Sequence, residues 1–201
     1  MDLGTRLITG SDGQAFPFDP GAFFLELLLT GGSEADQRWE LLRGTADLAA
    51  WLVDSRLALT APIDADDVRI RPAELREIKQ FRDTLWTVAH VVAAAEEPNE
   101  EELEIINAAA ESSLRPRIAL DTGVCEWATP ITGTQVLGTA AREAIDVIGG
   151  DRIDRLRECE AEDCALVFLD TSRPGNRRWC SMQRCGNRHK VRAYRARQVK
   201  D

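Results

Sequence analysis

Four of the five cysteines in this chain lie in its last quarter, in two pairs with equal internal spacing. They are Cys159 and Cys164, then Cys180 and Cys185, in the pattern C-x4-C-x15-C-x4-C. One tight turn can hold each pair, and the segment between the pairs can bring the two turns together. Because four thiolates complete the tetrahedral shell of a structural zinc ion, the pattern predicts one Zn²⁺ and a small fold built around it.

Other interpretations of the cysteines stay open, because four-residue loops are longer than the usual loop of a zinc knuckle. An iron–sulfur cluster, a redox-active dithiol pair or chance could each produce such a pattern. The iron–sulfur cluster is disfavoured because the segment suits a small fold around a redox-inert ion and contains no partner motif. His189 is a possible substitute ligand, but four cysteines already fill the shell, so an exposed helix position is the simpler interpretation.

The composition indicates a globular protein that we expect in the cytoplasm. The chain has 201 residues, of which 44% are hydrophobic and 29% charged, enough for an ordinary core. No apolar run reaches the roughly 18–20 residues of a membrane helix. The first residues, MDLGTRLITG, lack the pattern of a secretory signal. Disulfides are disfavoured in the reducing cytoplasm.

Hydrophobic periodicity predicts a mainly α fold with small β elements. We expect a helical N-terminal domain over residues 1–150 and a zinc module over residues 151–201. The predicted helices run from Ser33 to Val53, from Pro72 to Glu96, from Asn99 past Ala110, and from Gln135 to Ile148. The proposed N-terminal caps are Ser33 with Asp36 for the first helix and Asn99 for the third.

Two hairpins are expected in the N-terminal domain. Their turns are Ser11-Asp12-Gly13 and Asp121-Thr122-Gly123. FFLELLL, which begins at Phe23, is too short for its periodicity to decide between a strand and a helix. Cys125 lies in the second hairpin, where we expect a buried, inert thiol.

The zinc module is predicted to contain a knuckle, a hairpin and a helix, in a treble-clef-like order. The hairpin would pair a strand over 166–169 with a return strand that begins at Arg178 and Trp179, across a turn at 174–176. The helix would begin near Ser181 or Cys185.

Charge is distributed unevenly along the chain. Residues 1–150 carry 12 Lys and Arg against 26 Asp and Glu, a net charge of −14, whereas residues 151–201 carry 13 against 8, a net charge of +5. Ten basic residues and no acidic residue lie between Arg173 and Lys200. A basic end on an acidic chain indicates a local site for a polyanion.

In a C-terminal helix, four arginines would form one stripe: Arg184, Arg188, Arg192 and Arg195. Val191 and Tyr194 would lie beside it and dock the helix on the hairpin. A simpler role for the nearest arginines is to offset the charge of about −2 on a zinc ion bound by four thiolates. Phosphate contact is the functional alternative. The candidate nucleic-acid-binding residues are Arg177, Arg178, Arg184, Arg188, Lys190, Arg192, Arg195 and Arg197.

The segment DCALVFLDTSRPGNRRWCSMQRCGNRHKVRAYRAR resembles the CGNR zinc finger of a bacterial family that is common in actinobacteria. The tetrapeptide itself lies at residues 185–188, and FDPGAFFLELLLTG gives a weaker similarity to the helical ABATE domain that precedes the finger in that family. The resemblance implies that the four cysteines bind zinc. It also implies a stress-induced transcription regulator that binds DNA. A single short finger usually binds with modest affinity, so we expect the N-terminal domain to form a homodimer or to sense a small-molecule effector. By their chemistry, Gly186 would permit a close or strained backbone at the start of the helix, and Asn187 would cap that turn or bond the neighbouring backbone.

Two competing functions remain. A zinc-braced module could bind an acidic protein, or its basic helix could pack on the acidic domain of the same chain. An enzyme is not expected, because the chain has two histidines, no glycine-rich phosphate loop and no histidine–carboxylate metal motif. For DNA binding, the sequence predicts a steep loss of affinity with salt and loss of binding when Arg188 and Arg192 are replaced by alanine.

Overall fold

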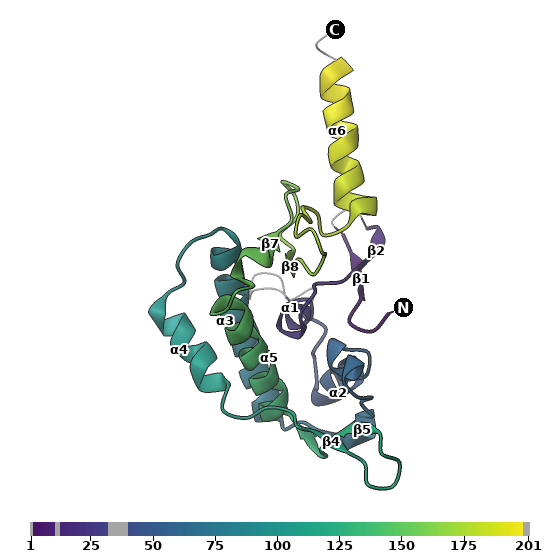
Figure 1. The fold of residues 1–201 in the computed structure, drawn as a ribbon, viewed down its shortest axis with the longest axis vertical. Coiled ribbons are helices and arrows are strands. Elements are labelled where there is room, and N and C mark those ends of the chain that lie inside the picture. Colours follow the sequence, from purple (N-terminus) through teal and green to yellow (C-terminus); the bar gives the residue numbers. More distant parts are fainter. Residues whose placement is uncertain (1, 11–12, 32–39, 199–201) are drawn as a thin grey trace.

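The computed structural model describes residues 2–10, 13–31 and 40–198, and in that part of the chain it is mainly α-helical with small β elements, as predicted (Figure 1). The helices are α1 (Phe23–Leu28), α2 (Thr45–Val53), α3 (Pro72–Ala93), α4 (Glu100–Ala109), α5 (Gly133–Ile148) and α6 (Asn187–Gln198). The strands are β1 (Arg6–Thr9), β2 (Ala15–Phe18), β3 (Val68–Arg69), β4 (Pro116–Ile118), β5 (Cys125–Trp127), β6 (Ile131–Thr132), β7 (Leu156–Glu158) and β8 (Val167–Leu169).

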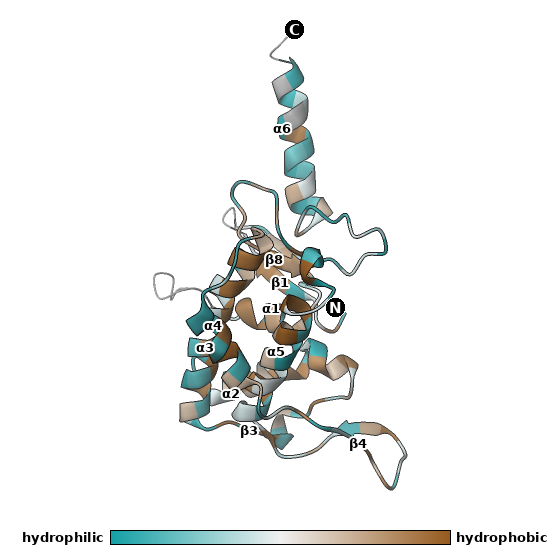
Figure 2. Ribbon diagram, turned by 60° about the vertical axis from the view of Figure 1, so that its left-hand side comes forward, coloured by the Kyte–Doolittle hydropathy of each residue, from teal (hydrophilic) through white to brown (hydrophobic). Residues whose placement is uncertain are grey.

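Helices α3 and α5 form the centre of the body. Each has one apolar stripe at helical spacing, so packing the two stripes together removes both from water. The buried side chains on these two helices include Leu75, Ile78, Phe81, Leu85, Val88, Val92, Val136, Ala140, Ala144 and Val147. Helix α4 packs against both helices and closes one side of the core. Figure 2 shows the apolar residues gathered here, whereas α6 is largely hydrophilic.

The short segment that periodicity could not assign forms helix α1. All six of its residues are buried, against α3 and α5. A carboxylate oxygen of Glu143 on α5 accepts a hydrogen bond of 2.8 Å from the backbone N–H of Phe24, because the first N–H groups of a helix have no partner within it.

The predicted first helix is shorter than expected. Helix α2 begins at Thr45, since Gly44 takes extended backbone angles and donates its N–H to the Asp47 carboxylate. Leu42, expected inside this helix, is buried but precedes it. Ser33 and Asp36, the proposed cap, lie outside the described residues, as does Trp39. The other three helices are confirmed, and the Asn99 side chain caps α4 by accepting from the N–H of Glu101.

Both predicted hairpins are present. Strands β1 and β2 pair antiparallel, as do β4 and β5, although Ser11 and Asp12 of the first turn lie outside the described residues. The expectation of a buried Cys125 is wrong, because this side chain is exposed. Exposure falls along β5 from Cys125 at its start to the buried Trp127 at its end, so the end of the strand reaches the core and its start does not.

The parallel pair β3–β6 brings the first turns of α3 and α5 together. There Glu74 accepts hydrogen bonds from Arg71, at 2.7 Å from the backbone N–H, and from the hydroxyl of Thr134, at 3.0 Å. Burial acts to raise the pKa of Glu74, but the hydrogen bonds from Arg71 and Thr134 outweigh it and lower the pKa to about 2. The ionised carboxylate therefore joins the two helices.

We expect this junction to make the protein sensitive to acid. The pKa of Glu74 is below its ordinary value of 4.5, so its contribution to the free energy of unfolding is complete above about pH 4.5 and is lost as the pH falls toward 2. Glu74→Gln should lower the free energy of unfolding at pH 7 by about 1–3 kcal/mol. It should also reduce the loss of stability that occurs as the pH falls below about 4.5. Urea denaturation from pH 7 to pH 2.5 measures both, with exposed Glu77→Gln as the control. If the two variants lost the same stability between pH 7 and pH 2.5, Glu74 would not be the source of the acid sensitivity.

The C-terminal module and the body share side chains. Leu156, Val167 and Leu169 of β7 and β8 belong to the main core, whereas Phe16 and Phe18 of β2 pack with the cysteines in a second cluster. The division of the chain at residues 150 and 151 stays a prediction, and packing across it is extensive. None of the helices in the described ranges is long and apolar enough to cross a membrane.

Candidate metal centre and basic helix

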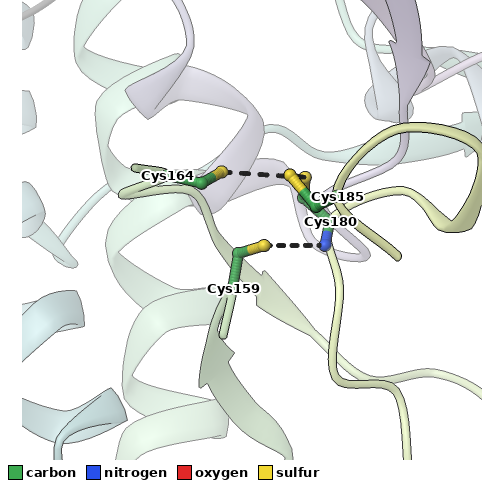
Figure 3. A group of neighbouring side chains, drawn as sticks. All are labelled: Cys159, Cys164, Cys180 and Cys185. Atoms are coloured by element: carbon green, nitrogen blue, oxygen red, sulfur yellow. Dashed lines mark hydrogen bonds between the residues drawn. The ribbon is translucent and has the colours of Figure 1, made fainter. Parts of the chain in front are cut away.

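The four paired cysteines meet at one point (Figure 3), where the loop between β7 and β8 meets the chain that leads into α6. Their Sγ atoms all lie within 4.8 Å of one another, with 3.7 Å between Cys164 and Cys180 and 3.4 Å between Cys180 and Cys185. A tetrahedral zinc ion with Zn–S bonds of about 2.3 Å requires sulfur separations of about 3.8 Å. The geometry fits one such ion, and the four cysteines form a candidate metal-binding site.

The pKa shifts of the cysteine thiols also favour a bound cation. Hydrogen bonds from Cys164 and Cys180 hold the pKa of the Cys159 thiol far below its usual range. The same hydrogen bonds raise the pKa of Cys164 to about 12, and they raise the pKa of Cys180 as well. Four sulfurs this close cannot all ionise unaided, so a divalent cation is what would allow every ligand to be a thiolate.

Backbone hydrogen bonds fix each cysteine pair. In the first loop, the N–H of Cys159 donates to Leu166 O at 2.9 Å, and the N–H of Cys164 donates to Ala161 O at 2.9 Å. The second pair lies around one π-helical turn, Met182–Gly186, which leads directly into α6. The basic helix is therefore anchored at the metal site.

The residues after Cys185 have the roles expected from their chemistry. A side chain at Gly186 would place its Cβ 2.8 Å from the Met182 sulfur and 3.2 Å from the Trp179 ring, so the backbone approaches both closely, although the exposed Met182 side chain can move aside. The side chain of Asn187 donates to the carbonyl of Gln183 at 3.1 Å and bonds the preceding turn.

The predicted return strand is wrong. Strand β8 pairs with β7, which precedes the first cysteine, so the knuckle is the tip of that hairpin. The chain after β8 turns instead around the buried carboxylate of Asp170, which accepts from the N–H of Ser172 at 2.9 Å and of Arg177 at 2.7 Å. These hydrogen bonds outweigh the effect of burial and lower the pKa of Asp170. A loop thus replaces the strand.

Arg177 occupies a structural position, although the sequence placed it among the nucleic-acid candidates. Its half-buried guanidinium donates to the carbonyls of Trp179 at 3.1 Å, Cys180 at 2.7 Å and Asp19 at 3.0 Å. It also lies 4.1 Å from the ring centroid of Phe168. Burial lowers the pKa of Arg177 below its usual value. Because one side chain contacts the ligand Cys180 and the N-terminal segment, it joins the metal site to the body.

The N-terminal hairpin and the segment after it also connect the metal site to the body. Gly21 has φ of +84°, and a Cβ there would lie 2.3 Å from the carbonyl oxygen of Leu169. The N–H of Leu169 donates to Pro20 O at 2.8 Å, so β8 runs directly beside the segment after β2. Phe18 is buried between the two. Sequence reasoning missed this contact, because nothing in the local pattern of residues 15–21 refers to a segment about 150 residues away.

Helix α6 extends away from the body, as Figure 1 shows. Every α6 side chain whose exposure is described is exposed or half-exposed. The expectation that Val191 and Tyr194 dock the helix on the hairpin is wrong, since they are 48% and 58% exposed. The hypothesis that the basic helix packs on the acidic domain of its own chain is likewise wrong.

The predicted arginine stripe divides into three parts. Arg184 precedes α6 and places its guanidinium 4.6 Å from the ring centroid of Phe16. Arg188 donates at 3.2 Å to the Cys185 sulfur, which matches the simpler role of offsetting thiolate charge. Arg192 lies one turn further, exposed, and Arg195 beyond it. Lys190 and Arg197 are exposed on the opposite face.

The knuckle contributes acidic residues that sequence reasoning did not use. Glu160 accepts two hydrogen bonds of 2.8 Å from Arg178, and Asp163 accepts one of 2.7 Å from Arg188. A cavity of about 350 Å³ opens between the knuckle and the base of α6. The sequence did contain a signal for these ion pairs. CEAEDC has three acidic residues between its cysteines, whereas the basic C-terminal helix has no acidic residue.

Comparison with known families agrees with this architecture. Residues 155–198 match the family described as CGNR zinc finger, and residues 21–151 match ABATE, described as putative stress-induced transcription regulator. Among curated proteins, none matches this chain. The two family matches confirm the resemblance inferred from the sequence. Because residues 21–151 are well over half of the chain, the protein belongs to the ABATE family of putative stress-induced transcription regulators and has a CGNR zinc finger at its C-terminal end.

Proposed function

We propose that this protein regulates transcription in the cytoplasm by binding DNA through α6, with one structural Zn²⁺ at the four cysteines. The observation that carries the proposal is the isolation of α6. Five of its twelve residues are Lys or Arg, none is acidic, and the helix stands clear of a body whose net charge is negative. The negative body repels a polyanion, so association is directed to this one element.

The dimensions of α6 suit a groove of duplex DNA. Twelve residues at 1.5 Å each give a length of about 18 Å, and the major groove, about 12 Å wide, admits an α-helix. Basic side chains on opposite faces of α6, such as Arg195 and Arg197, can reach phosphates on both walls. A metal-anchored base holds the orientation of the helix during binding.

Alanine substitution at the outer half of α6 tests the proposal. Arg195→Ala/Arg197→Ala should weaken binding to a random duplex by about tenfold or more at low salt and reduce the slope of log K against log salt by about 2. Both residues are remote from the sulfurs, so zinc content should not change. Fluorescence anisotropy over a salt series measures affinity and slope together.

The matched control removes the same charge from the body. Arg43→Ala/Arg76→Ala changes two exposed arginines of the helical part and should leave both affinity and slope close to the wild-type values. Zinc-loaded wild-type protein that fails to bind duplex at low salt would overturn the proposal. Equal losses in the two double variants would assign any binding to bulk charge and not to α6.

The second candidate is a zinc-braced module that binds an acidic protein without binding DNA. Its specific support is the exposure of Val191 and Tyr194, because apolar side chains on a basic helix suit a protein groove better than phosphates. Failure of the zinc-loaded protein to bind DNA would favour this candidate.

We assign the helical body a role in ligand sensing or dimerisation and no catalytic role. A groove of about 560 Å³ between α2 and β3 has a wall of small side chains, including Ala46, Ala49 and Ala50. Arg69 and Arg71 also line it, together with one acidic residue, Asp66. Apolar walls beside cationic groups suit a small organic anion as effector.

A further inference from the structure

The loop between the first two cysteines contains two acidic residues that face the basic helix. Asp163 lies 2.7 Å from a guanidinium nitrogen of Arg188 and 3.9 Å from one of Arg192. Glu162 lies 3.6 Å from another nitrogen of Arg192 and is 93% exposed. The metal site fixes this juxtaposition, because both the loop and the base of α6 supply its ligands.

These contacts affect only one face of α6. At 100° per residue, Arg188, Arg192 and Arg195 share a face, and the two acidic residues cover its base. Lys190 and Arg197 lie on the opposite side. A phosphate that approaches Arg188 or Arg192 must replace a carboxylate and remain beside it, so the base of the arginine face is a poor phosphate site.

We propose that Glu162 and Asp163 determine specificity: they lower the affinity of α6 for DNA phosphates in general, so that tight binding requires additional contacts. The inference rests on the proposed function and assigns residues to it. Like charges beside a binding face suppress binding to wrong partners, and in this helix the wrong partner is any duplex of arbitrary sequence. Exposed ion pairs are weak, so a correct site can displace them at little cost.

Neutralising the two carboxylates is the direct test. Glu162→Gln/Asp163→Asn should bind random duplex DNA about three- to tenfold more tightly than wild type, with a salt slope steeper by between 1 and 2. The gain should shrink in an Arg192→Ala background, because part of it passes through that guanidinium. A gain that is unchanged in this background would overturn the inference.

A charge-matched control separates local pairing from net charge. Glu101→Gln/Glu104→Gln neutralises two exposed carboxylates on α4, on the side of the body, and should leave the affinity near the wild-type value (Figure 1). An equal gain from this pair would assign the effect to overall charge and overturn the proposal. Zinc stoichiometry is measured on every variant, because Asp163 neighbours Cys164.

Glu162→Gln alone keeps the test valid if Asp163→Asn releases the metal. The Glu162 side chain is almost fully exposed, so its replacement should leave the fold intact, raise affinity about twofold, and lose this effect with Arg192→Ala. Wild-type binding without a gain in any carboxylate variant would overturn the inference and leave the proposed function standing. Failure of the wild-type protein and of every variant to bind duplex at low salt would overturn the proposed function itself.

Discussion

Replacing Cys180 by serine should release the metal and unfold the C-terminal segment that depends on it, namely the Cys159–Cys164 loop and the chain from Trp179 to the end of α6. Strand β8, whose Val167 and Leu169 lie in the main core, should stay folded with the helical body. The second hydrophobic cluster has seven buried residues, three of which are cysteines of the site. So small a core cannot offset the conformational entropy of the segment without a metal. Structural zinc supplies about 10–16 kcal/mol of binding free energy in finger peptides, so we expect complete loss of order.

Three measurements on the Cys180→Ser protein test this expectation. Zinc per chain should fall from one to near zero. Helicity by circular dichroism should fall by about the share that α6 contributes, because an isolated helix of twelve residues is marginal in water. Trypsin should cleave the arginine-rich end quickly and leave a resistant helical fragment. DNA binding should be lost in the same sample.

Cys125→Ser is the matched control for this substitution. Cys125 is exposed in the β4–β5 hairpin and lies outside the four-cysteine cluster, so zinc content, helicity and protease resistance should equal those of the wild-type protein. Unfolding of the whole chain upon loss of zinc would show that the module and the body form a single cooperative unit. A folded, zinc-free C-terminal segment would show that the metal has no structural role.

Features of this fold that depend on local sequence were predictable. The long helices follow from apolar stripes at helical spacing, and the Asn99 cap follows from a side chain that competes for a free backbone N–H. The metal site was predictable for a different reason: four cysteines with ligand spacing leave few arrangements that a small segment can adopt.

Features that depend on distant segments were not predictable. Arg177 looks like one more surface arginine in a basic stretch, and only its contact with Asp19 makes it structural. The prediction of a return strand was wrong because the Asp170 carboxylate gives the backbone an alternative set of hydrogen bonds. The prediction of a buried Cys125 failed because the body covers the other end of β5, at Trp127, and leaves Cys125 exposed. In each case the deciding partner, or its absence, lies elsewhere in the chain.

The attachment of the metal site to the body should depend on Arg177. Methionine at this position keeps the unbranched stem but removes the donors, so the carbonyls of Trp179, Cys180 and Asp19 lose their partner. An unsatisfied buried acceptor costs about 1–3 kcal/mol, and because such losses are not additive we expect Arg177→Met to lower the free energy of unfolding by about 3 kcal/mol. Urea denaturation of the zinc-loaded protein measures the loss.

The adjacent Arg178→Met provides a control of the same residue type. Arg178 is exposed and pairs with Glu160, so its replacement should cost less than about 1 kcal/mol. Two arginines that look alike in the sequence should thus differ about threefold in their effect on stability, because one binds buried carbonyls and the other a solvated carboxylate. If both variants lose the same stability, the hydrogen bonds of Arg177 do not hold the metal site to the body, and the packing of β8 and of the buried phenylalanines does so instead.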